Sequence, residues 1–412
     1  MKLKYIISGL FYLTVSQCYA QERNLDYYLT NATANSPVLN DLRNQILSAR
    51  IDSQILLAST RLLVTAGGNS FFAPSGNGFG YDRAITNGGQ LQGVVTATKN
   101  LIPHASLRLQ YMSLKFQIDS LNAARGISEQ DLRKAIIAQY ITTYGDQLQV
   151  QFNKELHSML SKEDTALKTL TRQNVYRQVD YLSFLITYEQ LNLTRLQLEH
   201  QFKNDYATLN YLAGIIDTSA LPLQRPEFNL NDNFNFDNSI FITKFRTDSL
   251  KLINNSALIN AGYRPKISLY ADGGYLSTFS FEGYKNFGAS AGINLSIPIY
   301  DGHQRRLQLS KITLAEKTRQ KNKEFFTNQY HQQIAQLKQQ LLLIDELTSS
   351  INKQMNYIQT LVDADMRLLQ TGDIKITDLV LAINNYINIK GLNVQNIVSR
   401  MQIINQINYW NR

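Results

Sequence analysis

Two long stretches without proline constrain this chain more than any other feature of its sequence. Residues 104–221 and 299–412 contain no proline, so both are free to form very long helices. Apolar residues recur in them at steps of three, four or seven, which predicts helices packed through heptad stripes. The prolines lie at Pro37, Pro74, Pro103, Pro222, Pro226, Pro265 and Pro298.

The stripe pattern also predicts how many neighbours each helix has. One helix of the first half carries two separate stripes, and two stripes on one helix imply contacts with two different neighbours. We call them stripe A and stripe B. Stripe A consists of Val175, Val179, Leu182, Ile186, Leu193 and Leu196, and stripe B of Phe184, Tyr188, Leu191, Leu198 and Phe202.

Each proline-free stretch is interrupted once by a turn signal, near 172–175 and near 370–374. Glycine and asparagine accept the left-handed backbone conformation at low cost, so each stretch is expected to fold back there as a helical hairpin. Shorter helices at Leu25 to Ser59 and Asp237 to Ala261 are expected to stack on the return arms, and Gly126 could break the first long arm. The residues at the two tips are Gln173 and Asn174 in the first half and Thr371 and Gly372 in the second.

The two halves repeat one pattern, because glycines, turn residues and strand-to-helix transitions recur at a shift close to 199 residues. We therefore expect a first repeat at 21–213, a linker at 214–236 and a second repeat at 237–412. Each repeat should contain a helix, two strands and a long helical hairpin. The strands are expected near 61–68, 90–102, 265–275 and 287–300.

Alternating residues in the strands predict sheets with two different faces. From Phe287 to Ile299 the odd positions are mostly apolar and the even positions are small or polar. Strands of this length could cross a bilayer at a tilt, and one face of a soluble sheet is the alternative. Aromatic residues expected in the connecting loops suit a membrane interface: Phe71, Phe72, Phe79, Tyr81, Tyr275, Phe279, Phe281 and Tyr284.

Residues 1–20 have the pattern of a secretory signal, with Lys2 and Lys4 before an apolar stretch and a small-residue cleavage site ending at Ala20. Lipidation of Cys18 is the alternative. The single cysteine and five scattered histidines exclude a thiolate metal site, and no catalytic constellation is present, so we expect no metal, no cofactor and no enzyme activity. The formal charge is +9, but the sequence has no basic cluster interleaved with aromatic residues, which argues against nucleic-acid binding.

This combination resembles the TolC-like outer-membrane efflux proteins over essentially the whole mature chain. Three motifs carry the likeness in the second half, at the entry to the third strand, at the exit from the fourth strand and at the hairpin tip. They are Tyr263-Arg264-Pro265-Lys266-Ile267-Ser268-Leu269, then Leu295-Ser296-Ile297-Pro298-Ile299-Tyr300-Asp301-Gly302, then Thr371-Gly372-Asp373-Ile374-Lys375-Ile376-Thr377-Asp378-Leu379.

The resemblance implies an α+β membrane protein in the cell outer membrane. Three chains would form a homotrimer, with a 12-stranded β-barrel in outer-membrane lipid and a periplasmic α-helical tunnel. It would be a passive exit duct of a tripartite efflux or type I secretion system, opened at its periplasmic tip by an adaptor and an inner-membrane transporter. The expected tip gate is Asp378, with Asp180 at the equivalent place in the first hairpin and Asp373 beside the second turn.

Two departures from the family pattern qualify these expectations. A second acidic ring would fall at Leu381, so the constriction is expected to be single, and Asn174 stands where the family usually has glycine. An ordinary solvated helix acid is the alternative interpretation of Asp378 and Asp180. The alternative functions are a periplasmic coiled-coil scaffold or adaptor without a barrel, and a surface-anchored hydrolase. The sequence names neither the cargo nor the partners.

Overall fold

The computed structural model describes residues 23–74, 76, 78–230, 236–278 and 285–411. The expected signal segment and Cys18 lie outside them. The chain divides into two compact units. We call the first the strand unit, formed by Pro37–Gln130, Asp232–Ile334 and Asn411–Arg412, and the second the turn unit, formed by Met1–Ser36, Asp131–Asn231 and Ala335–Trp410. Each unit takes segments from both repeats, because the two longest helices contribute to both.

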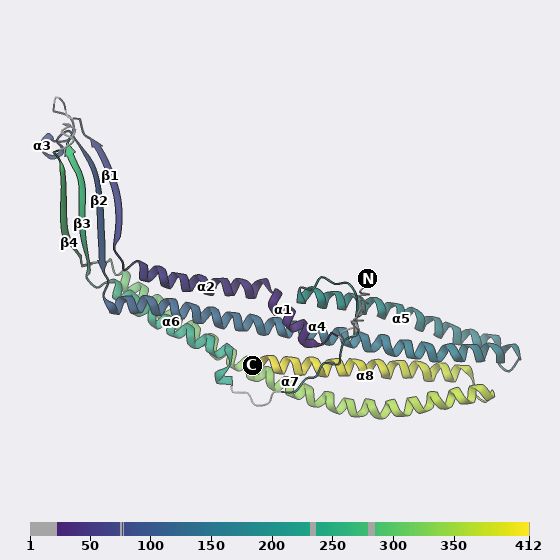
Figure 1. Cartoon of the computed structure of the whole chain (residues 1–412). Coiled ribbons are helices and arrows are strands. Elements are labelled where there is room, and N and C mark those ends of the chain that lie inside the picture. Colours follow the sequence, from purple (N-terminus) through teal and green to yellow (C-terminus); the bar gives the residue numbers. More distant parts are fainter. Residues whose placement is uncertain (1–22, 75, 77, 231–235, 279–284, 412) are drawn as a thin grey trace, which may run out of the picture. The chain divides into compact units, whose positions relative to one another are not determined.

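The strand unit contains one four-stranded antiparallel sheet in the order β1-β2-β3-β4 (Figure 1). Its pairings join neighbours in sequence and also join the two halves, since β2 pairs with β3 from Gln90↔Thr278 to Leu101↔Ile267. No strand outside this set pairs with β1 or β4 among the described residues. The strands are β1 (Leu63–Phe72), β2 (Gly89–Leu101), β3 (Lys266–Thr278) and β4 (Phe287–Ser296).

Three strands differ from the ranges expected from sequence. β1 continues past the glycine pair to Phe72, β3 continues to Thr278, and β4 stops at Ser296, two residues before Pro298, which has no N–H to donate to a ladder. The expected placement in loops was wrong for three of the aromatics. Phe71 and Phe72 belong to β1 and Tyr275 belongs to β3, whereas Phe279, Phe281 and Tyr284 lie outside the described residues.

The remaining elements of the strand unit are helices that join the strands. α2 (Pro37–Ala58), α3 (Arg83–Thr86), the 3₁₀ turn η1 (Phe236–Asn238) and α6 (Ile240–Gly262) accompany the first parts of α4 (His104–Arg172) and α7 (Gln304–Thr371). α6 packs on both long helices. The Asn254 amide donates to the Leu109 carbonyl at 3.0 Å and the Arg319 guanidinium donates to the Phe245 carbonyl at 3.2 Å.

α4 is one helix of 69 residues, so the break considered at Gly126 does not occur. The glycine serves packing instead. A Cβ added there would lie 2.0 Å from the Cδ1 atom of Ile240, so a larger residue would require the Ile240 side chain at the start of α6 to move. The start of α7 is set by Asp301, whose carboxylate accepts the backbone N–H groups of His303 at 2.9 Å and Arg305 at 2.8 Å.

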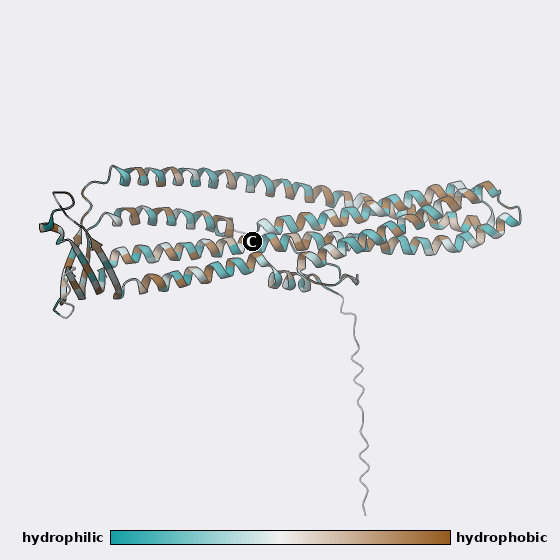
Figure 2. Cartoon of the chain, turned by 90° about the horizontal axis from the view of Figure 1, so that it is seen from above, coloured by the Kyte–Doolittle hydropathy of each residue, from teal (hydrophilic) through white to brown (hydrophobic). Residues whose placement is uncertain are grey.

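The turn unit is a group of helices that run alongside one another (Figures 1 and 2). It contains α1 (Leu25–Asn35), α5 (Gln178–Ala213), α8 (Ile376–Trp410) and the later parts of α4 and α7. The helix expected from Leu25 to Ser59 is two helices, because Ser36 precedes Pro37 and takes an extended conformation with ψ of 117°. No helix among the described residues is long and apolar enough to cross a membrane.

The segment after α5 is held in place by contacts with residues before α1 and with α4. Arg23 forms an ion pair with Asp217. The fully buried Tyr140 donates its hydroxyl to the carbonyl oxygens of Arg23 at 3.1 Å and Gln224 at 2.7 Å. The Asn35 amide donates to the last carbonyls of α5 at 3.2 Å. These contacts satisfy backbone groups that would otherwise be left without partners around a non-helical segment.

Candidate functional site

The two helical turns lie at the same end of the turn unit (Figures 1 and 2). The first joins α4 to α5 and the second joins α7 to α8. Asn174 has φ of 60° and Gly372 has φ of 82°, so both occupy the left-handed region. These residues are separated by the same shift that relates the two halves of the sequence.

Both turns end their outgoing helices with the same hydrogen-bond pattern. The Val175 N–H donates to the Leu170 carbonyl at 3.0 Å, and the Asp373 N–H donates to the Leu368 carbonyl at 3.0 Å. Each is joined by a shorter-range bond from the left-handed residue itself. The pattern is a Schellman motif, which satisfies carbonyls that have no partner within the helix. Asn174 accepts this conformation less readily than glycine.

The two turns touch each other. The Tyr176 hydroxyl donates to the Leu369 carbonyl oxygen at 3.0 Å, and a Cβ added to Gly372 would lie 3.0 Å from Cγ1 of Val175. Burial and then the charge of Asp373 raise the pKa of Tyr176, which therefore stays a hydrogen-bond donor at neutral pH. Thr371 and Gln173, also expected at the tips, are the last residue of α7 and the first residue after α4.

The two expected gate acids occupy matching positions but have different surroundings. Asp180 and Asp378 both lie in the first turn of a return helix, where the helix dipole favours a negative charge. Asp180 is paired with Arg177, which donates from Nε at 2.9 Å and from Nη2 at 3.0 Å. Asp378 is exposed and has no ion-pair partner among the described residues. Its charge is therefore available to solvent.

A third acid lies close to Asp378 and was missed from the sequence. Asp365 on α7 is only 7% exposed, and burial, followed by the charge of Asp378, raises its pKa. It falls at a heptad position between Val362 and Leu369, which are otherwise apolar stripe residues. A carboxylate at an apolar heptad position was the signal that could have found it. Leu381, at the position where a second acidic ring would fall, is 62% exposed.

Glu163 on α4 repeats this pattern between Leu160 and Leu167. It is 9% exposed, its Oε2 atom is buried without a partner, and burial raises its pKa. The hairpin arms near the turns thus hold two acids, Asp365 and Glu163, whose pKa values are raised by burial. Within the described ranges no three His, Cys, Asp or Glu side chains are grouped so as to hold a metal ion.

A hollow of about 560 Å³ adjoins the first turn. Lys168, Arg172 and Arg177 contribute to its lining, together with Asn174 and Tyr176, and no acidic side chain does. Arg177 is paired with Asp180, so Lys168 and Arg172 give the first turn its net positive charge, whereas Asp373 and Asp378 outnumber Lys375 and give the second turn a net negative charge. The two tips offer different chemistry despite their matching backbones.

Solved structures share this architecture over almost the whole chain. The outer-membrane channel OprN aligns with a TM-score of 0.76 at 13% identity, over 94% of this chain and 89% of that chain. VceC, an outer membrane protein of Vibrio cholerae, aligns with a TM-score of 0.75 at 12% identity, over 94% and 96%. The CmeC outer membrane channel of Campylobacter jejuni aligns with a TM-score of 0.75 at 12% identity, over 94% and 85%. No family model and no curated protein matches the chain.

These alignments confirm the fold predicted from the sequence, which is that of the TolC-like outer-membrane channels. They extend over both units and both halves of the sequence. With identities of 12% to 13%, few side chains are shared, so the roles of individual tip residues depend on the geometry of this chain.

Proposed function

We propose that this chain, which has the fold of the TolC-like outer-membrane channels, is one protomer of a trimeric exit duct in the cell outer membrane. The duct is passive and performs no reaction. An inner-membrane transporter and a periplasmic adaptor open it at the helical turns, as parts of a tripartite efflux or type I secretion system. The repeats at 21–213 and 237–412, the linker at 214–236 and a cleaved signal at 1–20 belong to this proposal.

The observation that carries the proposal is the sheet with two open edges. β1 and β4 each have one edge without a strand partner among the described residues. An open edge leaves backbone N–H and C=O groups unsatisfied, which lipid does not tolerate. Four strands are too few to close a barrel alone, and three copies give about twelve, within the range seen for membrane barrels.

The chemistry of the two sheet faces supports placement in lipid. In the register, Ile267 pairs with Leu295 and Leu269 pairs with Ile293, which gathers apolar side chains on one face. These residues are 38% to 71% exposed in the single chain. An apolar outward face and a polar inward face are typical of outer-membrane barrels.

The helices supply a second, independent argument for assembly. Stripe B packs inside the chain, where Phe184 is fully buried and Leu191 is 3% exposed. Stripe A remains uncovered, with Val179 at 69% and Ile186 at 72% exposed. A heptad stripe left in water favours a further helix, and the neighbouring protomer can supply one.

For the gate, we assign the leading role to Asp378. Three copies of an unpaired carboxylate around an axis would form a ring that attracts cations. Asp180 is a weaker candidate because Arg177 already pairs with it. Asp373 contributes to the raised pKa of Tyr176 at the contact between the turns. The basic hollow at the first turn is a suitable place for an acidic segment of an adaptor.

The mass of the membrane-extracted protein tests this proposal. Light scattering corrected for bound detergent should give three copies, and unboiled protein should migrate differently from boiled protein on a gel. Conductance in planar bilayers should accompany the trimer. A soluble periplasmic monomer would instead favour the alternative, a coiled-coil scaffold without a barrel.

A further inference from the structure

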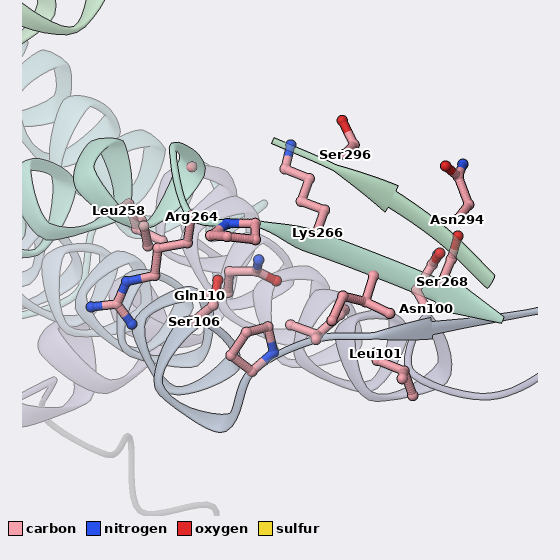
Figure 3. Close-up of a pocket in the computed structure, with 16 residues that line it drawn as sticks. Asn100, Leu101, Ser106, Gln110, Leu258, Arg264, Lys266, Ser268, Asn294 and Ser296 are labelled. Carbon is pink, nitrogen blue, oxygen red and sulfur yellow. The ribbon is translucent and has the colours of Figure 1, made fainter. Parts of the chain in front are cut away.

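A cavity of about 430 Å³ lies within the strand unit at the base of the sheet, where β2 leads into α4 and α6 leads into β3 (Figure 3). Its volume falls in the range of small-molecule sites, roughly 300 to 1,000 Å³. Part of its lining is apolar, from Ile102, Pro103 and Leu258, and part is polar, from Asn100 and Gln110 among others. Such a lining suits a ligand with both an apolar body and a polar group.

The cavity carries uncompensated positive charge. Arg264 and Lys266 both line it, and no acidic side chain does. Neither cation has an ion-pair partner in the described part of the chain. Asp301, the acid that follows β4, is engaged with the backbone N–H groups of His303 and Arg305. Figure 3 shows the two side chains pointing in different directions, so an anion in the cavity would meet each cation from a different side, and neither cation has a competing partner.

The strand register shows which face the cavity belongs to. Lys266 pairs with Ser296, and Ser268 pairs with Asn294 on one side and Asn100 on the other, so these polar residues share one face. In Figure 3, Lys266, Ser296 and Asn294 rise from one side of β3 and β4, and Leu101 projects from the other side of β2. In a membrane barrel the polar face is the inner one.

We propose that this cavity binds an amphiphilic organic anion, a carboxylate or sulfonate on a small apolar ring system, at the inner surface of the duct. The existence of the site follows from the cavity and its charges, and its placement at the inner surface rests on the proposed function. Three protomers would provide three such sites and a collar of Arg264 and Lys266 side chains. Rings of Arg and Lys select anions in other pores. The collar would have the opposite charge to the Asp378 carboxylates.

Naphthalene-2-sulfonate is a suitable probe, and its uncharged analogue is 2-naphthalenemethanol. Titration calorimetry on the full chain in lipid nanodiscs, with empty nanodiscs subtracted, should show binding of the sulfonate at least tenfold tighter than the alcohol. Arg264→Gln and Lys266→Gln should each weaken sulfonate binding about threefold, and the double change about tenfold, the scale of partly exposed charge pairs. Lys99→Gln is the matched control, since Lys99 pairs with Leu269 on the other face and should leave binding unchanged.

Equal binding of the sulfonate and the alcohol, or equal binding by wild type and the double variant, would overturn the site. The variants change exposed side chains, and an unchanged trimer mass establishes that they fold. Planar-bilayer conductance of the same wild-type sample reports on the duct separately. A conducting trimer that binds no sulfonate overturns the cavity proposal alone, and a non-conducting monomer overturns the duct alone, whatever the calorimetry gives.

Discussion

The hydroxyl of Tyr176 donates a hydrogen bond of 3.0 Å to the carbonyl oxygen of Leu369, which directly links the two helical turns. The acceptor lies at the end of α7 and also accepts the Gly372 N–H at 3.3 Å. One side chain from the first hairpin thus adds a second donor to a backbone carbonyl of the other. In the proposed duct, this bond would break if one turn moved without the other, and it would remain only if both turns moved together.

Tyr176→Phe should loosen the contact between the turns. The bond is worth about 0.5 to 1.5 kcal/mol, so the protein should fold and assemble while closed channels open more often. Single-channel recording should show a higher open fraction than wild type. Tyr357→Phe on α7 is the control, because Tyr357 is 67% exposed and its removal should change nothing. Identical recordings from the two variants would show that Tyr176 has no role in gating.

Gly372→Val should destabilise the second turn. The position has φ of 82°, and an added Cβ would lie 3.0 Å from Val175, so backbone strain and crowding act together. The expected loss is about 1 to 2 kcal/mol of unfolding free energy. Gly391→Ala is the control, since its Cβ meets nothing within 4 Å inside α8 and should stabilise by about 0.5 to 1 kcal/mol. Urea unfolding of both variants measures the contrast.

Asn174→Gly tests the first turn in the opposite direction. Asn174 has φ of 60°, which glycine adopts without a steric penalty. The variant should be as stable as wild type or slightly more stable, by a few tenths of a kcal/mol. Thermal unfolding followed by circular dichroism would show it. A marked loss of stability would mean that the asparagine side chain makes a contact of its own.

Asp378→Asn should weaken block of the channel current by multivalent cations, because it removes an exposed carboxylate that has no partner. Asp180→Asn should have a smaller effect, since Arg177 already neutralises Asp180. Currents in planar bilayers with added hexamminecobalt would rank the two. A larger effect at Asp180 would move the constriction to the first hairpin.

Asp146 should make stability depend on pH. Burial first, and then the neighbouring Asp205, raise its pKa from 3.8 to about 7. A carboxyl that holds its proton more tightly when folded contributes stability below its unfolded pKa and loses that contribution as pH rises to its folded pKa. Thermal stability should therefore fall between about pH 4 and pH 7, and Asp146→Asn should flatten the fall. If the fall in thermal stability with pH is the same in Asp146→Asn as in wild type, the fall comes from Asp365 or Glu163 instead.

Periodicity and backbone chemistry predicted the long helices, the strands and the two turns, and the resemblance to a known family supplied the fold. Prolines bound the long helices, and left-handed positions at Asn174 and Gly372 mark the places where the chain turns. Side-chain surroundings were not predictable in the same way. Asp180 and Asp378 are equivalent in sequence, and only the structure shows that one of them has an arginine partner.

The errors at the strands have a similar cause. The glycines at 67–68 suggested the end of a strand, yet β1 continues because its partner β2 extends equally far, with Phe72 opposite Gly89. The buried Asp365 was passed over because an apolar stripe predicts apolar residues. Cavities, such as the one beside Arg264 and Lys266, depend on how several elements meet, which no local pattern records.

The pairing of β2 with β3 sets an order for biogenesis. The β1–β2 and β3–β4 pairs can form between consecutive strands, but the centre of the sheet joins two strands separated by the whole first helical hairpin and the linker, so the sheet cannot be completed from neighbouring segments alone. Such distant pairing is slow to form because a long loop must close first. The first two strands must wait, with one edge exposed, until the third has been synthesised and delivered. A chaperone that shields that edge during transit would meet a need built into the topology.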